Sequence, residues 1–316
     1  NVPRILRELG ALALPVDCLP LAPETPAFTD IYWRHGQANV RAAHQVRRTE
    51  GLYPVYCSNY SCGPDSFVMH FFSWQMANKP WAVIETDGHS GDAGTRTRLE
   101  AFLFCVEQDR SLDQKTRDSR LVNDFRTIDG VSQDIPTTKK NDDLLLIPPM
   151  GVAAYATSAA LRGEGIRCET LPLPDRKALE LGRKNTSGKE CVPMIITAGS
   201  ILQRLEKDRH TNERFAYLMP TADGPCRFGS YNLLHKLIFE RNGWADRVKI
   251  VSPSDENYFE GLPADFQVRV WTGMVAGDVL LAALHDVRPV ETVPGAAQKI
   301  FDQAFSKLMD VLENPP

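Results

Sequence analysis

The sequence lacks several patterns that define common classes of protein. Its 316 residues contain neither glycine-rich nucleotide signature, G-x-x-x-x-G-K-[ST] or G-x-G-x-x-G. There is no Cys-x-x-Cys pair, which argues against a zinc ribbon or a bacterial ferredoxin-type cluster. No apolar run reaches the roughly 18 residues of a membrane-spanning helix, and a net charge of −4 gives no support for nucleic-acid binding. We therefore expect a globular protein that binds neither nucleic acid nor membrane.

The seven cysteines are an odd number and are not spaced as in a small secreted scaffold. This usage favours a reducing, cytoplasmic setting, in which metal binding or catalysis comes before disulfide formation. The chain starts at Asn1 without an initiator methionine, so we expect it to be a section of a longer protein.

Three of the cysteines stand just before an expected helix. Each has a proline within two residues, and an apolar run follows. Proline is favoured at the first helical positions, where its missing N–H costs nothing. The three segments are Cys62-Gly-Pro64, Cys191-Val-Pro193 and Pro225-Cys226.

A cysteine at a helix start has unusual chemistry. The helix N-terminus carries about half a positive charge and free N–H donors, which lower the pKa of a thiolate and prepare it to bind metal or attack an electrophile. Lys189 lies near Cys191, and Arg227 follows Cys226. The positive charges of both residues also favour the thiolate form of these cysteines. The alternative is that these thiols are inert packing residues, because free cysteine is often buried.

Strand, loop and helix alternate along the chain, which predicts βαβ units with parallel strands. We expect an α/β fold with two Rossmann-like parallel-sheet domains, residues 1–142 and 143–262, and a mostly helical C-terminal segment, 263–316. A polar excursion ends the first domain. Strands are expected at 11–16, 52–57, 80–85, 144–147, 166–171, 215–219 and 248–252, and a loop at 182–188.

In parallel sheets, ligands bind beyond the C-terminal ends of the strands. Five residues fall at that edge and are expected to face a common crevice: Cys18, Cys57, Cys62, Asp87 and His89. Asp87 and His89 are candidates for proton transfer. Equally, they could cap the following helix or bond to the glycine-rich turn.

Four motifs resemble the 2-hydroxyacyl-CoA dehydratase family, and most closely the dehydratase-like part of the large fused CoA-substrate-specific enzyme activases. The resemblance covers about residues 11–260. The motifs are Pro54-Val-Tyr-Cys-Ser-Asn-Tyr-Ser-Cys-Gly-Pro-Asp-Ser-Phe67, Glu85-Thr-Asp-Gly-His-Ser-Gly-Asp-Ala-Gly94, Gly188-Lys-Glu-Cys-Val-Pro193 and Gly224-Pro-Cys-Arg-Phe-Gly229.

This resemblance implies an iron–sulfur cluster that receives electrons from an ATP-hydrolysing activator, on another segment or another protein. It makes Cys62, Cys191 and Cys226 the ligand candidates, with Lys189 and Arg227 offsetting the negative charge of the cluster. Three thiolates would leave one iron open, as in catalytic metal sites. We expect a single [4Fe–4S] cluster, with a double cubane as the alternative, for which Cys18 and Cys57 are the extra thiols.

Two functional interpretations remain open. The first is an enzyme component for low-potential reductive or radical chemistry on a small molecule, with an acyl-CoA among the candidate substrates. The second is a non-catalytic electron-transfer or scaffold module of a larger activase-related protein. A zinc hydrolase would need His or carboxylate ligands beside the thiolates. A homodimer is an open alternative to a monomer.

Overall fold

The computed structural model describes residues 1–316 except 88–90, 114–115, 117–122, 124–131, 255–257 and 316. The chain forms two compact units that are discontinuous in sequence. Unit 1 contains residues 1–129, 187–191 and 223–234, and unit 2 contains 130–186, 192–222 and 235–316. Segments 187–191 and 223–234 fall within the expected second domain, 143–262, yet they pack with unit 1.

Unit 1 is built around a pair of parallel strands, in which Cys57 lies opposite Ile84. Helix α1 packs on α4, and α2 packs on α3. Its core includes Ile5, Ile84 and Leu99, which join α1, a strand and α4. The elements are α1 (Val2–Glu8), α2 (Arg34–Arg48), β1 (Val55–Ser58), α3 (Asp65–Met76), β2 (Ala82–Glu85) and α4 (Asp92–Ser111).

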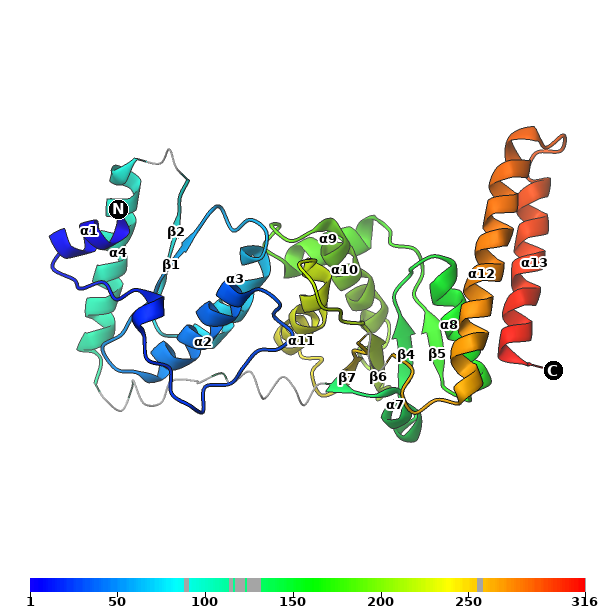
Figure 1. The fold of residues 1–316 in the computed structure, drawn as a ribbon, viewed down its shortest axis with the longest axis horizontal. Coiled ribbons are helices and arrows are strands. Elements are labelled where there is room, and N and C mark those ends of the chain that lie inside the picture. Colours follow the sequence, from blue (N-terminus) through cyan, green and yellow to red (C-terminus); the bar gives the residue numbers. More distant parts are fainter. Residues whose placement is uncertain (88–90, 114–115, 117–122, 124–131, 255–257, 316) are drawn as a thin grey trace. The chain divides into compact units, whose positions relative to one another are not determined.

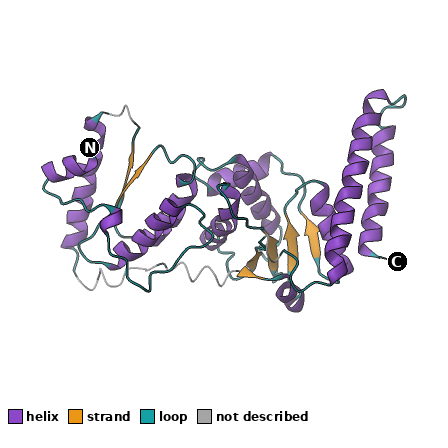
Figure 2. Cartoon of the chain, in the orientation of Figure 1, coloured by secondary structure: helices purple, strands orange, loops and turns teal. Residues whose placement is uncertain are grey.

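Unit 2 contains a five-stranded parallel sheet in the order β3-β7-β6-β4-β5. Figure 2 shows helices on the connections between these strands, as parallel strands require. The strands are β3 (Ser132–Gln133), β4 (Leu144–Ile147), β5 (Cys168–Thr170), β6 (Phe215–Leu218) and β7 (Val248–Val251). The helices are α7 (Ile135–Asn141), α8 (Val152–Gly163), α9 (Arg176–Asn185), α10 (Val192–Glu206), α11 (Tyr231–Arg241), α12 (Ala264–Val287) and α13 (Ala296–Glu313). The first four residues of α11, 231–234, belong to unit 1 and the others to unit 2.

Helices cover both faces of this sheet because its strands are apolar on both sides. Leu145 and Leu218 lie in the core cluster that includes Phe266 of α12. Their neighbours along the strands point the other way, and Tyr217 of β6 contacts the ring of Phe239 on α11. The result is a doubly wound sheet.

Helices α12 and α13 lie side by side and pack on α8 (Figure 1). Within the described residues, the stretch Ala264–Val290 is long and apolar enough to cross a membrane by length and composition. Charged residues, among them Arg269 and Asp278, interrupt it, so the sequence shows no continuous apolar run. One side of α12 is part of the packed protein, since Gly273 and Gly277 lie against Leu312 and Val152.

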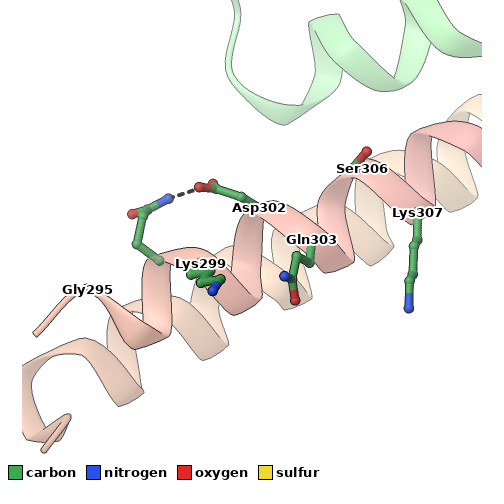
Figure 3. A pocket seen from close by; sticks show the side chains of 7 residues that line it. Gly295, Lys299, Asp302, Gln303, Ser306 and Lys307 are labelled. Carbon is green, nitrogen blue, oxygen red and sulfur yellow. Dashed lines mark hydrogen bonds between the residues drawn. The ribbon is translucent and has the colours of Figure 1, made fainter. Parts of the chain in front are cut away.

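Figure 3 shows the polar side chains that line a pocket along α13. Among them, the side-chain amide of Gln298 donates to Asp302 Oδ1 at 2.9 Å. All residues that line this pocket belong to unit 2. One face of α13 is apolar, and its Leu308 and Leu312 pack against α8.

The predicted fold class is confirmed: the chain is α/β with parallel sheets in two units and a helical C-terminal segment. Two local predictions were wrong. Residues 11–16 do not form a strand, and a short 3-10 helix, Val16–Cys18, follows them. The expected loop 182–188 begins inside α9, which continues to Asn185.

Candidate functional site

The three candidate cysteines all lie in unit 1, each ahead of a helix. Cys62 precedes Pro64, the N-cap of α3. Cys191 immediately precedes α10. Cys226 caps a 3-10 turn, Arg227–Ser230, which leads into α11, so the expected helix begins with a tighter turn. Cys62 and Cys226 are exposed and Cys191 is half-buried.

A hydrogen-bonded turn holds the Cys62 loop. The Asp65 carboxylate accepts from the Tyr56 hydroxyl at 2.8 Å and from Ser58 Oγ at 2.7 Å. Ser58 Oγ in turn accepts from the backbone N–H of Ser61 at 3.0 Å. Tyr60 and Ser61 both adopt positive φ, 54° and 55°, a conformation that non-glycine residues seldom adopt. These contacts fix the loop in a strained conformation that carries Cys62 to the surface.

A buried carboxylate fastens the Cys191 segment to α3. Glu190 Oε1 accepts from the backbone N–H and hydroxyl of Ser187, both at 2.9 Å, and pairs with His70 Nε2. The Glu190 side chain is fully buried, and its Oε2 has no hydrogen-bond partner among the described residues. Burial alone would raise the pKa of Glu190, but the hydrogen bonds from His70 and Ser187 outweigh it and lower the pKa to about 2.

The low pKa of Glu190 makes the stability of the protein depend on pH. Because the folded pKa lies below the ordinary value of 4.5, the carboxylate stabilises the fold above pH 4.5, and this contribution is lost as pH falls toward 2. We expect the free energy of unfolding to fall by on the order of 3 kcal/mol as the pH decreases from 4.5 toward 2. Urea unfolding of wild type and Glu190→Gln at pH 7, 4.5 and 3 measures it. An equal decline in both proteins would contradict the assignment.

Arg227 connects all three cysteine-bearing segments. Its Nη1 donates to Ser66 Oγ, at the start of α3, at 3.0 Å, and to the carbonyl of Lys189 at 3.5 Å. Its guanidinium lies 6.0 Å from the ring centroid of Phe67. Since Arg227 itself follows Cys226, one side chain ties together the loops of Cys62, Cys191 and Cys226. The Lys189 residue is exposed, and its backbone rather than its charge makes the contact.

Sequence reasoning missed Tyr231. Its hydroxyl lies 2.6 Å from Cys191 Sγ, and its ring stacks on Phe67 with centroids 5.7 Å apart. Burial raises the pKa of Tyr231, and the hydrogen bond to Cys191 and the nearby Cys191 and Cys226 side chains raise it further, while Arg227 opposes the shift. Nothing in the local sequence distinguishes Tyr231 from an ordinary helix-start aromatic residue.

The remaining candidates differ in their positions. Asp87 is exposed beyond β2, and its carbonyl accepts from the Thr86 hydroxyl at 3.1 Å. His89 lies outside the described residues. Cys18 is in the 3-10 helix and does not end a strand, so that expectation was wrong. Cys57 is the penultimate residue of β1 and lies at the expected C-terminal end of the strand.

The loops after the two strands of unit 1 do meet at one edge, as the topology requires. Ser61, which follows β1, donates its hydroxyl to Glu85 Oε1 at the end of β2 at 2.5 Å. Cys62 therefore stands at the C-terminal edge of the pair, where sequence reasoning expected it.

The candidate donors of unit 1 are three cysteine thiols, the donor type that holds iron–sulfur clusters. Within the described residues there is no group of three His, Cys, Asp or Glu side chains close enough to hold one metal ion. A cubane cluster is held by thiolates on separate irons, so its ligands can stand further apart. Three thiols on loops joined by Arg227, two of them exposed, satisfy that requirement in type and number.

Comparison with known proteins gives no further guide: no family model, curated protein or solved structure matches this chain.

Proposed function

We propose that this chain is an iron–sulfur enzyme component of the 2-hydroxyacyl-CoA dehydratase type. Cys62, Cys191 and Cys226 would hold a [4Fe–4S] cluster, and an ATP-hydrolysing activator would deliver the electrons. The observation that carries the proposal is Arg227, which joins the three cysteine segments within one compact unit. When bound, such a cluster supplies an electron at low potential to a small-molecule substrate, for which an acyl-CoA is our candidate class.

The chain's own residues have defined tasks in this proposal. Arg227 places a positive charge beside the thiolates, which favours binding of a negatively charged cluster. The Asp65 network and Glu190 hold two of the three loops in position. Cys62 lies three residues before α3, and Cys191 lies immediately before α10. In this proposal, the partial positive charge of each helix N-terminus favours the thiolate form of the cysteine next to it.

Exposure distinguishes this proposal from a closed electron-transfer module. Such a module would enclose its cluster, whereas Cys62 and Cys226 are both solvent-exposed. We therefore favour an enzyme component in which a small molecule can reach the open iron of the cluster. The alternative is a scaffold whose cluster cycles its redox state without meeting a substrate.

Iron and acid-labile sulfide analysis after anaerobic reconstitution tests the proposal. We expect a brown protein with on the order of 4 iron and 4 sulfide per chain, the composition of one cubane. On the order of 8 iron would instead indicate a double cubane, which needs more thiolates than these three. A colourless, iron-free protein, or one that retains zinc alone, would reject the proposed function.

A further inference from the structure

Tyr231 is held so that its hydroxyl meets the thiol of Cys191 at 2.6 Å. The residue is 4% exposed, and its ring is fixed on two sides. Phe67 stacks against it with an interplanar angle of 8°, and Phe228 contacts it edge-on at a centroid distance of 5.3 Å. Packing therefore places the hydroxyl, which has little freedom to turn away from the sulfur.

The direction of this hydrogen bond follows from the charge state of the sulfur. A thiolate carries no hydrogen, so the Tyr231 hydroxyl must donate once Cys191 is ionised. Hydrogen bonds to an ionised acceptor are roughly twice as strong as those between neutral groups. A hydrogen bond donated to a ligand sulfur stabilises the reduced cluster, which carries more negative charge than the oxidised cluster. Such hydrogen bonds help to set the reduction potentials of iron–sulfur clusters.

Arg227 does not make the same contact, since its guanidinium hydrogen-bonds to Ser66 Oγ and the Lys189 carbonyl. Its influence on the thiolates is that of a nearby charge, whereas Tyr231 contacts one sulfur directly. The two residues are therefore separable by mutation.

We propose that Tyr231 is a positioning residue that donates a hydrogen bond to the Cys191 thiolate and raises the reduction potential of the cluster that this thiolate helps to hold. The inference rests on the proposed function, because it assigns a role relative to that cluster. It adds a residue outside the four motifs that carry the family resemblance.

The test compares wild type with Tyr231→Phe, which removes the hydroxyl and keeps the stacked ring. Both proteins are reconstituted anaerobically and titrated under an applied potential. We expect unchanged iron content and an about tenfold lower ratio of reduced to oxidised cluster at a given potential, equivalent to a downward shift of about 59 mV for one electron. Electron–nuclear double resonance should also lose one exchangeable proton coupled to the cluster.

Tyr60→Phe is the matched control, because it removes a hydroxyl two residues from Cys62 at a side chain that is 49% exposed. It should leave the potential unchanged. Incorporation of 3-fluorotyrosine at position 231 supplies a second, opposite test, since its more acidic hydroxyl is a stronger donor and should shift the potential upward. This variant decides the matter if Tyr231→Phe loses its iron.

The outcomes separate the two proposals. Iron-bound Tyr231→Phe with the wild-type potential, or an unshifted potential in the fluorinated protein, overturns the role of Tyr231 and leaves the cluster assignment standing. A wild-type protein without iron overturns the proposed function, and the inference falls with it.

Discussion

Replacing Cys62, Cys191 or Cys226 by serine is expected to remove most of the iron from the anaerobically reconstituted protein. Each cysteine lies on a different loop of unit 1, so the loss of one thiolate leaves only two protein ligands. A serine hydroxyl is much harder to ionise than a thiol and is a poor substitute ligand for iron. Iron and sulfide per chain, together with the visible absorption of the cluster, measure the loss.

Cys105→Ser and Cys168→Ser are the matched controls and should keep their full iron content. Cys105 is exposed on α4, and Cys168 is buried in β5 of unit 2, where its thiol donates to the Ser158 carbonyl at 3.1 Å. Cys18→Ser and Cys57→Ser should also retain iron if the cluster is a single cubane. Loss of the cluster in Cys168→Ser alone would contradict the assignment of the site to unit 1.

Local sequence patterns were sufficient to identify the three candidate cysteines, but not the residues that lie next to them in the folded protein. The prolines after Cys62 and Cys191 mark helix starts through a rule that acts over two or three residues. Arg227 and its partner Ser66 are 161 residues apart, and Tyr231 and Cys191 are 40 apart. No periodicity encodes such pairings, because tertiary packing alone brings the segments together.

The wrongly predicted strand at residues 11–16 shows the limit of apolar content as a signal. Leu12 and Leu14 are 97% and 55% exposed, so the segment is apolar without being buried. A strand needs a neighbour that pairs with its backbone groups, and the described residues of unit 1 place β1 beside β2 only. Composition indicates that a segment is apolar, but not whether a partner strand exists.

The predicted loop at 182–188 was wrong only in its first half, and for a different reason. Gly182 and the polar residues after it resemble turn formers, yet α9 continues as far as Asn185 and only residues 186–188 lie outside a helix. The reason is the packing of α9 on α10, where Gly182 lies against the backbone of Ile195 and Gly199 lies against the backbone of Ala178. Here the two glycines allow α9 and α10 to approach each other closely, and neither glycine ends its helix.

This close packing makes both glycines sensitive to substitution. Gly199→Ala and Gly182→Ala are each expected to destabilise the protein by at least about 3 kcal/mol, a cost at the upper end for overpacked sites. A Cβ at position 199 would overlap the carbonyl oxygen of Ala178, and one at 182 would overlap that of Ile195. Both obstacles are backbone atoms, which cannot move aside as a flexible side chain can, so the two helices would have to separate.

Gly94→Ala is the control, because Gly94 lies within α4 and a Cβ there meets nothing within 4 Å. Alanine is the better helix former, so this change should stabilise the protein by about 0.5–1 kcal/mol. Urea unfolding of the three variants measures the difference. If Gly182→Ala and Gly199→Ala unfolded at the wild-type midpoint, α9 and α10 could not be in backbone contact. A loss in Gly199→Ala alone would place Gly182 outside that contact.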